Sequence, residues 1–299
     1  MTTYVDRSRY LTLDQGFNLG RPQVPAHIFS RERDEALLDH DNSVRIPCDM
    51  QSVIGGDVEA TAPLLLASYV RLKPGTPLVL KSGATSEIFY VIQGAGVTTW
   101  GDEQIRWQSG DVFLLPGGDK ETHWAEGEGN AVLWQCTNEP QLAYEGALPP
   151  PTEKSRIQPT HYPKAAMHRA LARAKKLEMK NGMKSMAIML ASESSKYGTI
   201  TPSLTLALNS VAAGTSQIPH RHNSVAISLV LEGESCYSIV NGNTVHWSRF
   251  ATFVTPGGAS HSHHNESAGN ALLLIVQDGG FYYHCRTMGF ATVDTQAPS

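Results

Sequence analysis

Five histidines gather in two short segments of the second half of the chain, and their spacing could hold a metal ion. His220 and His222 stand two residues apart in IPHRHN, and 39 residues after His222 the segment SHSHHN carries His261, His263 and His264. Side chains two residues apart on a strand point to the same face. Three neutral imidazoles on one divalent ion leave coordination positions open for a substrate or O₂. The pattern predicts a metal centre; histidines hydrogen-bonded in a polar pocket are the alternative.

The histidine segments lie in the second of two copies of one sequence unit. At a shift of 139 residues Gly75 falls on Gly214 and Gly94 on Gly233, and at a shift of 140 a longer set matches. That set is Trp107 on Trp247, Pro116-Gly117-Gly118 on Pro256-Gly257-Gly258, and Gly129-Asn130-Ala131 on Gly269-Asn270-Ala271. The difference of one residue between the two shifts falls in a hairpin, where loop length varies. Self-similarity in a fixed order over about 60 residues indicates two copies of one folded unit.

Short apolar runs in each copy predict strands. The 26 glycines and 17 prolines of the chain stand mostly between runs of β-branched and aromatic residues. These runs are 64–72, 88–92, 112–115 and 132–135 in the first copy, and 203–211, 227–231, 252–255 and 272–276 in the second. Many short strands joined by turns are typical of β-sandwiches and β-barrels. The expected fold class is all-β, with two jelly-roll-like β-barrels and a helical linker.

We expect four parts along the chain. They are an N-terminal extension at 1–60, a first barrel at 61–145, a linker with a helix at 146–198, and a second barrel at 199–299. The extension shows one weak helical stretch, Arg31–Leu38, and the linker begins with PPPTEKSRIQPTHYP, which is too rich in proline to predict a strand. After it, apolar residues from Ala166 to Leu177 follow helical spacing, which predicts a helix over 164–180 with a basic outer face.

Composition narrows the partners. The net charge is −4 and no sustained basic block occurs, which argues against nucleic acid or an anionic membrane as a partner. The longest apolar runs are strand-sized, far short of a membrane span, and the segment MTTYVDRSRY has no apolar core, so we expect no signal peptide. Four cysteines stand far apart, as is usual for proteins of a reducing cytoplasm. The expected protein is globular and cytoplasmic.

Both halves resemble the cupin superfamily, whose first motif is G(X)5HXH(X)3–4E(X)6G and whose second is G(X)5PXG(X)2H(X)3N. The second half supplies Gly214, His220, His222 and Gly233 for the first motif, and Pro256, Gly258, His261 and Asn265 for the second. By this resemblance the chain is a bicupin, and its metal ligands are His220, His222 and His261. Phe250 replaces the first glycine of the second motif, which is a turn position. Ala226 replaces the glutamate of the first motif, so a site with four protein ligands is not expected.

The string PHRHNSVAISLVLEGE is similar to a segment of gentisate 1,2-dioxygenases, which also carry alanine in place of the glutamate. In that family three histidines hold Fe(II), and an aromatic substrate chelates the iron before O₂ attacks. The resemblance implies that His263 is a catalytic residue beside the metal, which hydrogen-bonds the substrate or an oxygen intermediate. It also implies that Asn209, Ala226 and Ser228 line the substrate pocket, with Ser228 in place of an arginine that helps to hold a carboxylate. Because a serine offers no charged fork, we expect a substrate other than gentisate.

The first copy lacks the ligand pattern. Lys81 and Gly83 stand where the second copy has His220 and His222, Glu87 stands at the glutamate position, Glu121 at that of His261, and His123 at that of His263. A lysine ammonium beside two carboxylates forms an ion-pair cluster more readily than a metal site. We expect the first barrel to bind no metal, to stabilise the pair, and to supply surface for a homodimer or tetramer.

The expected function is an Fe(II)-dependent, extradiol-type ring-cleaving dioxygenase that acts with O₂ on a hydroxylated aromatic. Two alternatives stay open: another metallocupin enzyme, such as a manganese- or nickel-dependent lyase, isomerase or aminohydrolase, and a cupin that binds a small ligand without catalysis. Histidine ligation alone does not discriminate Fe(II) from Mn, Ni or Zn. Alternation along the strands predicts that Val211, Ile218, Leu229 and Phe253 surround the metal centre and keep it dry.

Overall fold

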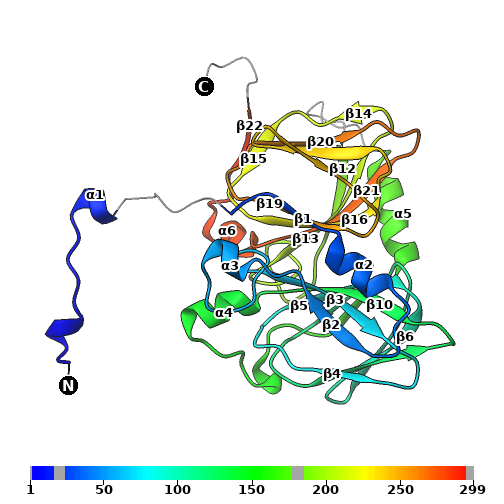
Figure 1. Cartoon of the computed structure of the whole chain (residues 1–299), viewed down its shortest axis with the longest axis horizontal. Helices are drawn as coiled ribbons and strands as arrows, with labels where there is room; N and C mark the ends of the chain where they lie inside the picture. The colour runs from blue at the N-terminus through cyan, green and yellow to red at the C-terminus, as the bar shows by residue number, and fades with distance from the viewer. Residues whose placement is uncertain (1, 17–23, 177–184, 294–299) are drawn as a thin grey trace.

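The computed structural model describes residues 2–16, 24–176 and 185–293, which form two β-barrels stacked one on the other (Figure 1). The first barrel consists of β3 (Leu66–Leu72), β4 (Leu78–Leu80), β5 (Glu87–Gln93), β6 (Ala95–Trp100), β7 (Glu103–Gln108), β8 (Val112–Leu115), β9 (Glu121–Glu126) and β10 (Ala131–Thr137). The second consists of β13 (Thr205–Val211), β14 (Thr215–Ser216), β15 (His220–His222), β16 (Ala226–Glu232), β17 (Cys236–Val240), β18 (Asn243–His246), β19 (Thr252–Thr255), β20 (His261–Asn265) and β21 (Ala271–Gln277). The predicted all-β class with two barrels is confirmed.

Each barrel is built from two antiparallel sheets with the same strand order. The larger sheet runs β8-β5-β10-β3 in the first barrel and β19-β16-β21-β13 in the second, and these are equivalent strands of the two copies. The smaller sheet runs β4-β9-β6-β7 in the first barrel and β15-β20-β17-β18 in the second, where β22 (Phe290–Thr292) adds one more strand. The histidine-bearing strands β15 and β20 therefore lie next to each other in one sheet.

The strand that precedes each barrel joins the other barrel. β1 (His27–Phe29), from the extension, pairs with β19 of the second barrel, and Figure 1 shows it in the upper barrel; β11 (Thr160–Tyr162), from the linker, pairs with β8 of the first. A helix follows each of these strands, α2 (Arg31–Leu37) or α5 (Lys164–Ala174). Then comes an edge strand, β2 (Val44–Pro47) or β12 (Ser185–Leu190), which pairs with the barrel that it precedes. The structural repeat thus includes a β-α-β segment that sequence self-comparison does not detect.

The connecting segments differ from expectation in three respects. The linker contains two strands, β11 and β12. Its proline-rich part accommodates β11, because Thr160–Tyr162 fits between Pro159 and Pro163 and leaves both prolines outside the paired residues. The extension holds two strands beside its helix, since β1 and β2 find hydrogen-bonding partners only in the folded barrels. α5 ends at Ala174, a turn follows at residues 175 and 176, and the predicted helical residues 177–180 lie outside the described residues.

The remaining helices are short. They are η1 (Val5–Arg7), α1 (Leu13–Gly16), α3 (Gln51–Ile54), α4 (Glu139–Glu145), η2 (Thr152–Lys154) and α6 (Gly280–Cys285). Of these, η1 and α1 stand away from both barrels (Figure 1). Among the described residues, no helix combines the length and the hydropathy that crossing a bilayer would need.

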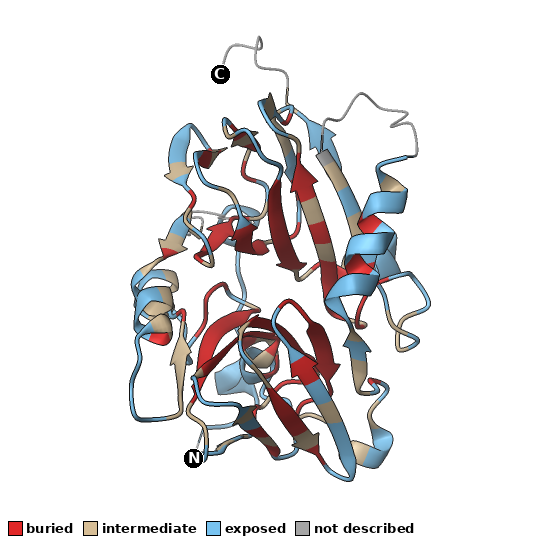
Figure 2. Ribbon diagram, turned by 90° about the vertical axis from the view of Figure 1, so that its right-hand side faces the viewer, coloured by how far each residue is buried: buried red, intermediate tan, exposed pale blue. Residues whose placement is uncertain are grey.

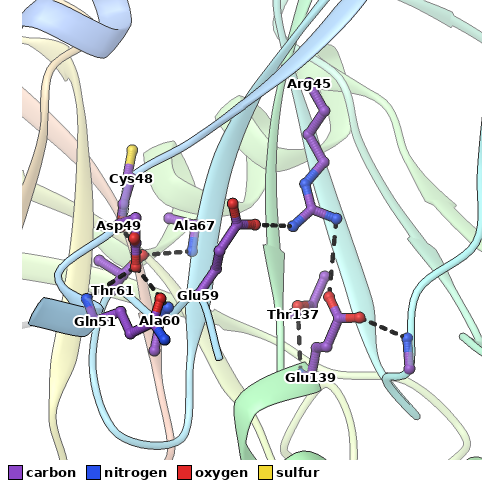
Figure 3. Close-up of polar contacts among 11 residues, drawn as sticks. Arg45, Cys48, Asp49, Gln51, Glu59, Ala60, Thr61, Ala67, Thr137 and Glu139 are labelled. Atoms are coloured by element: carbon purple, nitrogen blue, oxygen red, sulfur yellow. Dashed lines mark hydrogen bonds and ion pairs between the residues drawn. The ribbon is translucent and has the colours of Figure 1, made fainter. Parts of the chain in front are cut away.

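Hydrogen bonds dock the extension on the first barrel (Figure 3). Asp49 Oδ1 accepts a bond from the backbone N–H of Ala60 at 3.0 Å. Thr61 Oγ1 donates to the carbonyl of Cys48 at 2.6 Å and accepts from the N–H of Ala67 at 2.8 Å. Since Thr61, Cys48 and Ala67 are all fully buried, these bonds satisfy polar backbone groups that water cannot reach.

The larger sheets pack face to face, and the largest hydrophobic core lies between the barrels. Figure 2 shows the buried strands of the two barrels facing each other. Tyr69, Ile88 and Trp134 from the first barrel meet Leu229 and Leu274 from the second in this core. Because each larger sheet is covered on both faces, its strands are buried along almost their whole length. This explains why the sequence shows continuous apolar runs there instead of strict alternation.

Two of the four hydrophobic residues expected around the metal centre lie elsewhere. Val211 and Phe253 do belong to the core inside the second barrel. Leu229 instead points into the core between the barrels, and the side chain of Ile218 is 52% exposed. Strand alternation accounts for Leu229, because Ala226 and its neighbours two and four residues on occupy the inner face of β16.

Truncating Leu229 therefore tests the packing of the barrels. We expect Leu229→Ala to lower the free energy of unfolding by about 2–5 kcal/mol, because it opens a cavity in the core between the sheets. Chemical denaturation measures the change. The control is Val79→Ala, whose side chain is 55% exposed and which should stay within about 0.5 kcal/mol of the unmodified chain. An equally small change for Leu229→Ala would contradict the placement of Leu229 in this core.

The turn before β19 carries a bulky residue in a conformation that favours glycine. Phe250 has φ +61°, and Gly110, at the equivalent turn of the first barrel, has φ +91°. The N–H of Phe250 donates to the carbonyl of Val230 at 2.6 Å, and the guanidinium of Arg249 lies over its ring at 4.6 Å. The turn position of the second motif is therefore kept without the glycine.

Candidate metal centre

The three predicted ligands lie on two neighbouring strands. β15 carries His220 and His222, β20 begins with His261, and the register places His220 opposite His261. The ring centroid of His261 lies 4.3 Å from that of His220 and 4.7 Å from that of His222, while the centroids of His220 and His222 are 6.3 Å apart. The structure thus brings together the three imidazoles that the motif resemblance implies as ligands.

Each of these three rings is fixed through the same nitrogen. Nδ1 of His220 lies 2.9 Å from the carbonyl oxygen of Ile218, Nδ1 of His222 lies 2.8 Å from that of Ser224, and Nδ1 of His261 lies 3.0 Å from that of Ala259. A carbonyl only accepts, so Nδ1 must carry the ring proton and donate it. The lone pair of each ring then lies on Nε2. Metal-ligating histidines show this arrangement, because the second hydrogen bond fixes the tautomer and the ring orientation.

Burial keeps the three rings neutral. Desolvation is the largest cause that lowers the pKa of His220 and of His222 below the usual value. Desolvation, followed by the proximity of His220, lowers the pKa of His261 to about 3. A neutral imidazole is the form that binds a metal ion. At neutral pH the three rings therefore offer three lone pairs.

The donor set fits a divalent transition metal, although the rings do not form a closed ligand cage. Within the described part of the chain, no three His, Cys, Asp or Glu side chains already stand at the spacing of ligands around an ion. The chemistry of the donors supports the fit, because the three imidazoles are neutral and their tautomers are fixed. The Nε2 of His222 lies 3.4 Å from the amide nitrogen of Gln277. The assignment of the ligands is accordingly a proposal.

His263 is buried beside the three rings, and His264 is not. The centroid of His263 lies 5.8 Å from that of His261, and Nδ1 of His263 lies 2.8 Å from Ser238 Oγ. His264 points to the other face of β20, where its ring stacks on Tyr237 with centroids 4.7 Å apart. Alternation along the strand thus separates His264 from the other four histidines.

The predicted pocket residues face the inside of the second barrel. Ala226 lies in the inner core, and Ser228 follows it on the same face of β16. Asn209 lies on β13 two residues before Val211, another residue of the inner core. Ser228 is 1% exposed and its hydroxyl has no hydrogen-bond partner; the buried amide oxygen of Asn209 has none either. Such unpaired polar atoms inside a barrel are what a bound polar ligand would satisfy.

Sequence reasoning missed three further polar residues of the second barrel. Thr255 and Gln217 each have a buried oxygen without a partner, and Gln277 approaches His222. Thr255 pairs with Ala226 across the sheet, so strand pairing from the repeat could have indicated it. Gln217 has no such signal, because its position depends on the bond from its N–H to the carbonyl of His263.

No lysine or arginine of the described residues is buried inside the second barrel. Of all Lys and Arg residues in the described part of the chain, Arg71 alone is buried, and it belongs to the first barrel, where it bonds Asn42 and the carbonyl of Glu35. Arg249 lies over the ring of Phe250. The inside of the second barrel thus combines apolar side chains with a few polar ones, and the described residues bury no fixed positive charge there.

The equivalent region of the first barrel holds no ion-pair cluster with Lys81. Lys81, directly after the end of β4, is exposed, while its neighbour Ser82 is buried. Glu87, Glu121 and His123 are fully buried, with His123 Nε2 3.1 Å from Glu121 Oε1. Desolvation raises the pKa of Glu121 to about 8 and lowers that of His123 to about 4. Burying an ammonium beside these groups would cost more than its pairing returns, which explains why Lys81 stays in water.

Comparisons with known proteins agree with this architecture. A family model described as "Cupin domain" matches residues 208–277, which include all the histidines of the site. A segment of 82 residues is 31% identical to 5-aminosalicylate 1,2-dioxygenase of Comamonas sp.; it covers 27% of this chain and only 22% of that protein.

Solved structures resemble most of the chain. The salicylate 1,2-dioxygenase from Pseudaminobacter salicylatoxidans has a TM-score of 0.74 at 16% identity, over 90% of this chain and 88% of that one. The salicylate 1,2-dioxygenase from Pseudoaminobacter salicylatoxidans in adducts with gentisate has a TM-score of 0.76 at 15% identity, over 94% and 88%. At this identity the likeness establishes the fold. The chain therefore shares the fold of these structures, and residues 208–277 match the cupin domain model.

Proposed function

We propose that the protein is an Fe(II)-dependent, extradiol-type ring-cleaving dioxygenase that acts with O₂ on a hydroxylated aromatic. The observation that carries the proposal is the set of three neutral imidazoles, His220, His222 and His261, with Nδ1 tied to backbone carbonyls and Nε2 available. The 82-residue similarity to a dioxygenase that acts on an aminosalicylate supports the reaction class. Bound iron would hold a chelating substrate and O₂ next to each other on one ion.

The chain's own residues would do four things in this reaction. His220, His222 and His261 hold the metal, and His263 hydrogen-bonds the reacting oxygen atoms. Asn209 and Ser228 orient the ring of the substrate through their unpaired oxygens. Val211 and Phe253 exclude water from the same space, which strengthens every polar contact there.

Oxygen uptake tests the proposal. The purified chain is reconstituted anaerobically with Fe(II) and given a panel of hydroxylated aromatics, among them salicylates, aminosalicylates and gentisate. We expect at least one of them to cause stoichiometric O₂ consumption and loss of the aromatic absorbance. Turnover only with Mn, Ni or Zn and without O₂ would favour a lyase, isomerase or aminohydrolase. Tight binding of an aromatic without turnover by any metal would favour a non-enzymatic ligand-binding protein.

Position 228 is predicted to set substrate preference. Because the described residues bury no lysine or arginine inside the second barrel, we expect weak or absent activity on gentisate, whose carboxylate would lie without a fixed cation beside it. Ser228→Arg should increase the kcat/KM for carboxylated aromatics by about ten- to a hundredfold, since a charge-assisted hydrogen bond contributes roughly 1.5–3 kcal/mol. Steady-state kinetics on gentisate and on an uncharged analogue measure the preference.

The control for size is Ser228→Met, which adds volume to the pocket without charge and should not favour the carboxylated substrate. Robust gentisate turnover by the unmodified chain would show that position 228 does not set specificity. So would an unchanged order of substrates in Ser228→Arg.

We also propose that the chain divides into four parts at residues 60, 145 and 198. The protein is proposed to be cytoplasmic and to form a homodimer or tetramer through the first barrel. Size-exclusion chromatography with light scattering tests the assembly, and a monomer at all concentrations would contradict it.

A further inference from the structure

Inside the second barrel, an indole, a hydroxyl and an imidazole form a hydrogen-bonded chain. The indole N–H of Trp247 donates to Ser238 Oγ at 2.9 Å, and Ser238 Oγ lies 2.8 Å from His263 Nδ1. All three residues are buried. The indole ring also packs with its edge toward His263, with centroids 5.5 Å apart, and Gly233 leaves room for it, because a Cβ there would lie 2.8 Å from Trp247 Cε3.

The first barrel contains the same chain of contacts at positions 140 residues earlier. The indole N–H of Trp107 donates to Thr98 Oγ1 at 2.9 Å, and Thr98 Oγ1 lies 2.7 Å from His123 Nδ1. The hydroxyl is a threonine in one copy and a serine in the other, but its role is the same. An arrangement present twice within one chain is a feature of the folded unit, independent of the metal centre.

The directions of these hydrogen bonds follow from what each group can do. An indole N–H only donates, so the serine hydroxyl must accept from it. The hydroxyl then has one proton to give, and among the described residues His263 Nδ1 is the acceptor recorded within its reach. Nδ1 therefore accepts, and the ring proton of His263 lies on Nε2. This tautomer is the opposite of the one held by His220, His222 and His261.

The first barrel shows what an Nε2–H does in this position. His123 Nε2 lies 3.1 Å from Glu121 Oε1, and a carboxyl oxygen can accept its proton. In the second barrel His261 replaces that glutamate, and within the described residues no hydrogen bond involves His263 Nε2. The buried donor of the second barrel is thus left for an acceptor that is not part of the protein.

We propose that Ser238 and Trp247 are positioning residues that hold His263 in the Nε2–H tautomer, so that it offers a neutral hydrogen-bond donor to a ligand oxygen beside the three other imidazoles. Three of the four histidines then offer lone pairs to a cation, and His263 offers an N–H to an anionic oxygen. His263 neither ligates the metal nor acts as a base in this state. The proposal deepens the proposed function and rests on it only where the ligand oxygen is identified as that of the chelating aromatic or of O₂.

Nuclear magnetic resonance tests the tautomer directly. Two-bond ¹H–¹⁵N correlation spectra of the metal-free, ¹⁵N-labelled chain distinguish protonated from unprotonated ring nitrogens, and single histidine substitutions assign the signals. We expect His263 to show a protonated Nε2 and an unprotonated Nδ1. His220, His222 and His261 should show the reverse pattern. A protonated Nδ1 on His263 would overturn the proposal.

Substitutions test the role of the hydroxyl. Ser238→Ala removes the proton donor, so His263 should become a mixture of tautomers, and kcat should fall about tenfold at unchanged iron content, as expected for one lost hydrogen bond. Ser238→Thr, which copies Thr98 of the first barrel, should keep both the spectrum and the activity. The matched control is Thr98→Ala, which should change the signals of His123 and leave turnover as it is.

Each outcome decides the proposal. The proposal would be overturned if Ser238→Ala left the His263 spectrum unchanged. It would also be overturned if Ser238→Thr lost the spectrum or the activity as Ser238→Ala does. If Ser238→Ala does not fold, Trp247→Phe provides a second variant, because a hydroxyl freed from the indole can accept from Nδ1 and should also mix the tautomers. The spectra need neither iron nor substrate, so a failure of every aromatic to cause O₂ uptake would end the proposed function and leave the tautomer assignment standing.

Discussion

His222→Ala is expected to lose most of its metal and, with it, nearly all turnover. Of the three proposed ligands, only His261 is more deeply buried than His222. The Nδ1 of His222 is held by the carbonyl of Ser224. Two imidazoles bind a divalent ion far more weakly than three, and loss of a ligand should exceed the roughly 10–100-fold that loss of an outer-shell partner costs in affinity. The combined substitution of His220, His222 and His261 by alanine should retain none.

Elemental analysis after anaerobic reconstitution and removal of free Fe(II) measures this. We expect one metal per unmodified chain, all of it in the second barrel, because the first barrel places exposed Lys81 and Gly83 where the second has histidines. The control is His264→Ala, which removes a histidine of the same strand that stacks on Tyr237 away from the site and should keep the metal. Two metals per chain, or full retention by the triple variant, would refute the assignment.

Much of this site could be predicted because the information is local. The HxH spacing of His220 and His222 on a strand forces both rings to one face, and the repeat fixes where His261 falls relative to them. The same alternation separates His263 from His264. Turn residues such as Gly110 mark positions where the backbone needs a positive φ, and the repeat aligns these positions even where Phe250 replaces the glycine.

What the sequence did not predict depends on contacts between distant segments. β1 and β11 are three residues long, carry no alternation of their own, and become strands only because the edge of the opposite barrel offers hydrogen-bonding partners. Alternation along the strand predicts Leu229 at the site only if one face of the strand lies inside the barrel and the other faces water. In a sheet covered by a second barrel both faces are apolar, so hydrophobicity does not reveal which face lines the pocket.

The unpaired polar groups inside the second barrel also could not be predicted from the sequence, for a physical reason. An unpaired buried oxygen, such as that of Ser228 or Thr255, is a property of the surroundings and not of the residue type. Likewise, nothing in the sequence indicates that Lys81 turns to solvent while Glu121 and Glu87 stay buried. Charge patterns predict ion pairs only when the partners are equally accessible, and here the carboxyl groups are inside the barrel and the ammonium is outside.

The second large effect is expected from His263→Ala, which should keep the metal and lose turnover by roughly 10²-fold, the usual cost of removing a positioned proton donor at a reacting group. The physical reason is that His263 is buried beside His261 and, unlike the other three rings, is tied through Nδ1 to the Ser238 hydroxyl. On the proposed assignment, His263 faces the bound substrate and contributes no lone pair to the ion. Metal content and single-turnover oxygen kinetics on the reconstituted protein separate the two roles.

His263→Gln provides the graded comparison, since an amide N–H can replace part of the imidazole's donation and should retain more activity than His263→Ala at equal metal content. Loss of the metal together with activity in both variants would mean that His263 is a ligand and that one of His220, His222 and His261 is not. Equal activity of both variants and the unmodified chain would mean that the Nε2 proton is not used in the reaction. The fold holds His123 by the same Nδ1 contact in the barrel without a ligand set, but His123 also bonds Glu121, so the His263 variants should unfold at a denaturant concentration no lower than that of the corresponding His123 variants. Only the loss of turnover should be specific to the second barrel, which assigns the effect of His263 to its place beside the three imidazoles.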